Sequence, residues 1–217
     1  MSLLLALLML GAPAQAQPGL IPHQDGSALL LRFPGVPPSL DDAVEHDRID
    51  DSWLALTMGD ARKAKFTSTA ARDDVRAALI RGDIGRAEAA SLDAQLIFVR
   101  NVAERLDTVW ATVGEGDFVH AAALLPVDAV QDPVVPALYR DALAEELDSL
   151  ATLFDQMASV RALRADGRNK SAMQAAWDLT ETAGGLYQAW RITDRQLAVV
   201  QAQMGSIYEA AEAATSW

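Results

Sequence analysis

The chain has 217 residues, of which 51% are hydrophobic and 22% are charged, a composition typical of a folded globular protein. Its 30 acidic residues outnumber its 18 Lys and Arg residues, which gives a net charge of −12. Nucleic-acid phosphates and anionic lipid headgroups are repelled by such a surface, so we expect no nucleic-acid partner. The sequence contains no cysteine, which excludes disulfides, thiolate metal sites and a cysteine nucleophile within it.

The first residues have the layout of a secretory signal peptide. An apolar run over residues 3–10 is followed by Gly-Ala-Pro and then by the small-x-small triplet Ala-Gln-Ala at 14–16. The apolar run is much shorter than the about 20 residues that cross a bilayer. We therefore expect cleavage after Ala16, no transmembrane span, and a location in the periplasm or outside a bacterial cell. Retention of residues 1–16, as an anchor or as a helix of the fold, is the alternative.

The rest of the sequence predicts a short arm followed by helices. Residues 17–38 are rich in proline and glycine, as in an extended arm or linker. Over 39–217 alanine is abundant, and long helices are expected at about 84–113, 137–165 and 172–214. Their apolar residues recur in alternating steps of three and four, as on helices that pack along a common seam. We expect an all-α fold: an elongated helical bundle whose last two long helices form an antiparallel hairpin.

Two adjacent glycines, Gly184 and Gly185, interrupt the last of these segments. The apolar series from Ala176 to Ala211 keeps its three-four alternation across them. A flexible loop has no reason to preserve that register, so the pattern favours one continuous helix that is weakened or gently bent at the glycines. A true break at this point is the alternative. The same register predicts that Trp190 lies in the core.

One spacing suggests a repeat. Asp83 and Asp117 each follow a glycine and lie 34 residues apart, which is the period of tetratricopeptide repeats. However, Gly-Asp also commonly separates two helices, and no third copy follows at that spacing. The pattern favours ordinary helix boundaries, whereas a true repeat would make region 82–121 a groove for a peptide or another ligand.

No motif for catalysis or cofactor binding is recognisable. The three histidines (His23, His46 and His120) do not pair at helical spacing, and no Gly-x-Ser-x-Gly, Ser-x-x-Lys, Walker or dinucleotide motif is present. We therefore expect no catalytic, cofactor-binding or metal-binding residues.

Aromatic residues that the core does not need are the candidates for partner binding. Trp53 and Trp110 are expected in the core. Trp217, at the end of the chain, and Tyr187 and Tyr208, beside the seam, are the partner-binding candidates, because a few aromatic anchors often dominate a protein interface.

These observations favour an exported, non-enzymatic helical interaction protein. It would be an assembly subunit, adaptor or chaperone of a bacterial envelope system, with other envelope proteins as partners, and homo-oligomerisation is compatible with this function. The alternative is a periplasmic ligand- or peptide-binding helical module that uses the tetratricopeptide-like region 82–121. An enzyme without a recognisable motif is less favoured.

Overall fold

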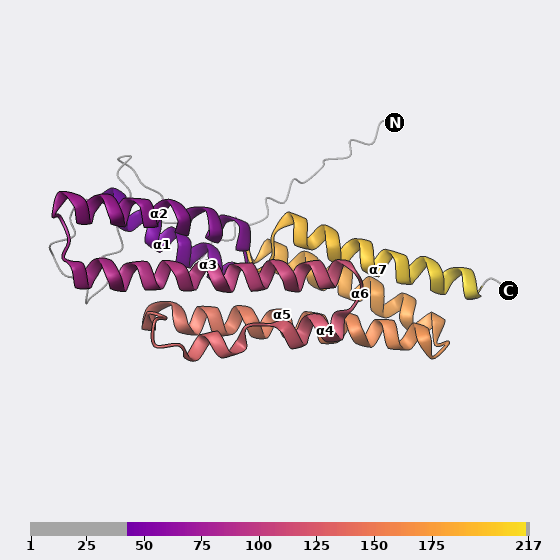
Figure 1. Cartoon of the computed structure of the whole chain (residues 1–217). Coiled ribbons are helices and arrows are strands. Elements are labelled where there is room, and N and C mark those ends of the chain that lie inside the picture. The colour runs from indigo at the N-terminus through magenta and orange to yellow at the C-terminus, as the bar shows by residue number, and fades with distance from the viewer. Residues whose placement is uncertain (1–42, 216–217) are drawn as a thin grey trace, which may run out of the picture. The chain divides into compact units, whose positions relative to one another are not determined.

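The computed structural model describes residues 43–215, with side chains from Arg48 onward, and every regular element in this range is helical. The elements are α1 (Ala43–Thr57), α2 (Ala61–Arg81), α3 (Arg86–Gly114), α4 (Phe118–Leu124), the 3-10 helix η1 (Val127–Gln131), α5 (Ala137–Ala165), α6 (Asn169–Gln188) and α7 (Asp194–Thr215) (Figure 1). The expected all-α fold is therefore confirmed. The expected signal peptide, the arm over 17–38 and Trp217 lie outside the described residues.

The helices pack as neighbours along the chain and are joined through α3 and α5. Helices α1, α2 and α3 contact one another, α4 and η1 lead the chain back onto α5, and α6 and α7 pack side by side as an antiparallel pair (Figure 1). Helix α5 also contacts α1, α6 and α7, and α3 contacts α7. None of the helices in the described range is long and apolar enough to cross a membrane.

The core follows the apolar seams that the sequence predicts in α3 and α5. In α3 the buried side chains include Leu96, Val99, Ala103, Leu106 and Val113. In α5 they include Leu143, Leu147, Leu150, Phe154 and Met157. Burial of each large apolar side chain stabilises the folded state by about 1.5–3 kcal/mol. The two seams therefore contribute a large part of the stability of the helical unit.

The predicted continuous helix over 172–214 is wrong. Gly184 and Gly185 do lie inside a helix, and a β-carbon at either would meet nothing within 4 Å. The helix ends shortly afterwards, at Gln188, and the chain reverses before α7 begins at Asp194. The predicted hairpin of 137–165 with 172–214 is corrected in its second arm: α5 contacts α6 across the short connection at 166–168, but this arm ends at Gln188, and α7 then packs against α6.

The predicted interpretation of the two Gly-Asp pairs as helix boundaries is confirmed, and the tetratricopeptide alternative is wrong. A tetratricopeptide repeat folds two helices within 34 residues. Between Asp83 and Asp117 the structure has a single helix, α3, of 29 residues. The two Gly-Asp pairs therefore mark the two ends of one long helix.

Candidate functional site

Two connections of the fold meet at one place. The α1–α2 turn contains Gly59, and the α6–α7 connection spans residues 189–193. Gln196, in the first turn of α7, is buried and joins them: its Nε2 donates to the Gly59 carbonyl at 3.0 Å, and its Oε1 accepts from the Thr193 backbone N–H at 2.7 Å. These two hydrogen bonds fix the position of the α1–α2 turn relative to the α6–α7 connection.

The α6–α7 connection begins with an unusual helix end at Trp190. The Trp190 N–H donates to the Tyr187 carbonyl at 3.0 Å, and the Arg191 N–H donates to the Leu186 carbonyl at 2.9 Å. This is the Schellman pattern, in which the residue after the C-cap takes a left-handed conformation and is usually glycine. Trp190 occupies that position with φ of 60°, and it is the one non-glycine residue of the described chain with a positive φ.

The same pattern with glycine ends four other helices. The left-handed glycines are Gly59 after α1, Gly82 after α2, Gly116 after α3 and Gly167 after α5. In each, the next residue donates to a carbonyl five positions back. Because a side chain in this conformation costs about 1–2 kcal/mol, Trp190 is the strained member of the set.

Trp190 is also exposed, which contradicts the prediction that it lies in the core. Its side chain is 63% exposed, whereas Trp53 and Trp110, predicted in the core, are buried. The three-four spacing of apolar residues across the α6–α7 connection is a coincidence. The apolar side chain that this connection buries in the core is Ile192 and not Trp190. The fold therefore gains little from the indole of Trp190.

The other predicted partner-binding aromatics lie on α6 and α7. Tyr187, three residues before Trp190, is 43% exposed at the end of α6. Tyr208 packs partly against the core and lines a shallow groove together with Trp177, which is 60% exposed. Trp217 lies outside the described residues. The structure thus brings Tyr208 near Trp177 and Tyr187 near Trp190.

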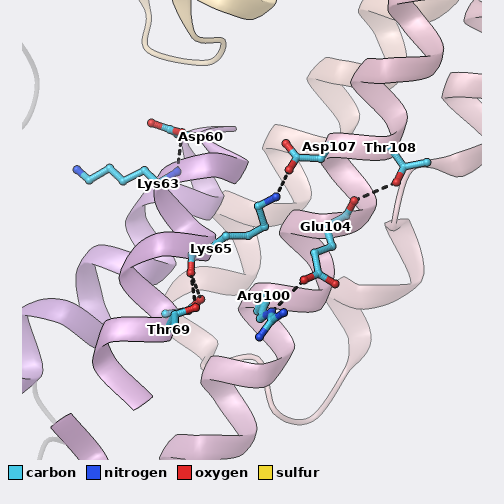
Figure 2. A network of polar contacts seen from close by, with 9 residues as sticks. Asp60, Lys63, Lys65, Thr69, Arg100, Glu104, Asp107 and Thr108 are labelled. Carbon is cyan, nitrogen blue, oxygen red and sulfur yellow. Dashed lines mark hydrogen bonds and ion pairs between the residues drawn. The ribbon is translucent and has the colours of Figure 1, made fainter. Parts of the chain in front are cut away.

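A pocket of about 500 Å³ opens where the two connections meet α3. Its wall includes Gly59, Arg62, Lys65, Trp110, Arg195 and Gln196. Lys65 reaches from α2 to Asp107 on α3, which ties these two helices together at the pocket (Figure 2). The pocket lies largely outside the region 82–121 in which the sequence would place a groove.

Glu146 is a buried acid behind this junction. Its side chain is fully buried on α5, and neither carboxyl oxygen has a hydrogen-bond partner in the described structure. Burial raises the pKa of Glu146 to about 8; the charge of Arg191 opposes this rise, and the charge of Glu145 adds to it. At neutral pH the group is therefore mainly a neutral acid, which avoids burying an unpaired charge.

Glu146, Gly59 and Gln196 were not identified from the sequence. The spacing could have found Glu146, because it lies three residues after Leu143 and four before Leu150 and so shares their buried face. No local pattern could have found the Gln196–Gly59 contact, since its two residues are separated by 137 positions.

Comparison with protein-family models, curated proteins and solved structures finds no match to this chain.

Proposed function

We propose that the protein is an exported, non-enzymatic interaction protein of the bacterial cell envelope, and that the end of α6 is its partner-binding surface. It would act as an assembly subunit, adaptor or chaperone. The signal-peptide layout of residues 1–16 supports export. Partner binding is supported by Trp190, whose indole is exposed and whose backbone has a left-handed conformation.

The reasoning rests on what the fold gains from Trp190. A tryptophan in this position strains the backbone by about 1–2 kcal/mol, and glycine would remove that strain. The side chain is 63% exposed, so folding buries only a minor part of it. Strain that does not serve packing is commonly found at functional positions, where it orients a group for binding.

The chemistry of the surface fits a protein partner. Trp190 and Tyr187 lie three residues apart at the end of α6 and are both exposed. Tryptophan and tyrosine are enriched among the residues that dominate interface energies, because each can bury a large apolar area and still make a polar contact. The acidic net charge favours a partner surface that carries basic groups around an apolar centre.

The test is capture of partners from envelope extracts by the purified protein, with quantification of each captured protein. Trp190→Gly is the key variant, because it relieves the strained φ and removes the anchor. We expect a partner whose recovery falls at least about tenfold with Trp190→Gly and with Tyr187→Ala, as for other interface anchors. The free energy of unfolding of Trp190→Gly should stay within about 1 kcal/mol of wild type, since relief of strain offsets the lost contacts.

Phe66→Ala is the matched control, because Phe66 is an exposed aromatic residue on α2, 76% exposed and away from α6. It should leave capture unchanged. Trp217→Ala tests the end of the chain in the same assay; it should keep the melting temperature within about 2 °C, as surface changes do, and weaken capture. If no captured protein depends on Trp190, Tyr187 or Trp217, the proposed surface is wrong.

A further inference from the structure

The pocket where α2, α3 and the α6–α7 connection meet has the features of a site for a small anion. It is about 500 Å³, within the range of small-molecule sites. Three cationic side chains contribute to its wall: Arg62 and Lys65 from α2, and Arg195 from α7. Helices α2 and α7 both begin at the pocket, and the beginning of a helix carries a partial positive charge.

The acidic residues of the wall are already engaged within the protein. Asp60 accepts from the Lys63 backbone N–H at 2.9 Å, and Asp194 accepts from the Arg195 backbone N–H at 2.8 Å. Asp107 pairs with the Lys65 ammonium group (Figure 2). These carboxylates are thus directed to helix ends and to Lys65.

The two arginines have no such partner. In the described part of the chain, neither the Arg62 nor the Arg195 guanidinium group makes a hydrogen bond or ion pair, although acidic residues outnumber basic ones in the protein. They come from helices that begin more than 130 positions apart, and they meet at one pocket. A guanidinium group presents paired N–H donors that match a carboxylate or phosphate.

Trp110 supplies an aromatic part of the wall. It forms part of the pocket wall and is nine-tenths buried, and its indole N–H has no hydrogen-bond partner in the described structure. This N–H is not accessible to solvent, so a ligand in the pocket would contact the ring of Trp110 rather than the N–H, and the indole signal reports on the wall without holding the ligand.

The walls are also held in place before any ligand binds. Gln196 connects Gly59 to the α6–α7 connection, and the Lys65–Asp107 pair connects α2 to α3. A site whose walls are fixed loses less conformational entropy on binding.

We propose that this pocket binds a small organic anion, with Arg62 and Arg195 holding its carboxylate or phosphate group and the pocket wall at Trp110 enclosing the rest. This function is separate from capture of a protein partner at the end of α6. It is therefore tested on the purified protein alone.

The test is titration with inorganic phosphate and, separately, with succinate, at constant ionic strength, followed by calorimetry and by ¹H–¹⁵N NMR. The indole N–H signal of Trp110 is assigned by its loss in Trp110→Phe. We expect at least one of the two anions to bind with Kd of about 1 mM or tighter and to shift that signal. Binding of phosphate alone identifies a phosphate-bearing ligand, and binding of succinate alone identifies a carboxylate.

Arg62→Ala and Arg195→Ala should each weaken binding at least about tenfold. Arg86→Ala is the control, because it removes the same charge from an exposed residue at the start of α3, outside the pocket wall. Circular dichroism and the melting temperature verify that each variant is folded. The proposal is overturned if neither anion shifts the Trp110 signal at 10-fold the expected Kd, or if Arg86→Ala weakens binding as much as the pocket variants do.

Discussion

The carboxyl group of Glu146 lies directly against the α-carbon of Gly59, so that a β-carbon at Gly59 would stand 2.6 Å from Oε1 of Glu146. It would also stand 2.9 Å from the carbonyl oxygen of Arg191. Helix α5, the α1–α2 turn and the α6–α7 connection therefore meet where there is no room for a methyl group.

Gly59→Ala should destabilise the protein by about 2–4 kcal/mol. The left-handed conformation at φ of 70° contributes about 1–2 kcal/mol of this, and the two close contacts contribute the rest through displacement of Glu146 or of the Arg191 backbone. Chemical denaturation monitored by circular dichroism measures the change.

Gly82→Ala separates these two contributions. Gly82 has φ of 84°, but a β-carbon there would meet nothing within 4 Å. Its substitution should therefore show only the conformational part, about 1–2 kcal/mol. Equal losses at Gly59 and Gly82 would mean that the Glu146 contact imposes no steric constraint.

Stability should fall as pH rises above the ordinary range of a glutamate, because of Glu146. The pKa of Glu146 is about 8 in the folded protein, whereas its ordinary value, which applies to the unfolded chain, is 4.5. Below pH 4.5 the group is protonated in both states, so its contribution to stability is fully present. Between pH 4.5 and 8 the unfolded chain loses the proton first, and up to about 5 kcal/mol is lost by the time the folded group ionises.

Glu146→Gln isolates this effect. Glutamine has a similar shape and does not titrate, so the variant should lack this part of the pH dependence and become more stable relative to wild type as pH rises from 5 to 9. The comparison uses the free energy of unfolding of the two proteins across that range. A difference that stays constant with pH would show that Glu146 titrates normally in the folded state.

Replacing Gly184 and Gly185 by alanine should stabilise the protein. Both lie within α6, and a β-carbon at either meets open space. Each replacement gains about 1 kcal/mol from helix propensity, hence up to about 2 kcal/mol for the pair. Thermal unfolding would show a higher midpoint, whereas a lower one would mean that these glycines have a positive φ or a close backbone contact.

Export predicts a defined start of the mature chain. If the chain is exported as we propose, material from the envelope fraction should begin at Gln17, because the small-x-small triplet at 14–16 is the expected cleavage signal. Intact mass spectrometry measures this directly. Recovery of the full-length mass from that fraction would contradict cleavage.

The sequence predicts the helical class well because the information for it is local. The three-four spacing of Leu143, Leu147 and Leu150 identifies a buried face without reference to any other part of the chain. Helix ends are also predictable where glycine occupies the left-handed position, as at Gly82 and Gly116.

The end of α6 was missed because that local signal is absent. Trp190 occupies the position at which glycine would have marked the boundary, and the glycines that do occur, Gly184 and Gly185, lie inside the helix. The candidate pocket was missed for another reason. Arg62 and Arg195 meet only after the chain has reversed at this unmarked boundary.

The chain reversal between α6 and α7, at which no glycine stands, also has a consequence for dimer formation by helix exchange. Five residues, 189–193, separate α6 from α7, and the apolar series of the two helices would stay in register if those residues straightened into one rod. In an opened molecule, the face of α7 that packs on α6 could then be buried on α6 of another opened molecule, by exchange of identical helices. The closed protomer and the exchanged dimer would share their helix contacts and differ in the backbone around Trp190. Their balance would therefore depend on protein concentration and on the residue that stands at that single position.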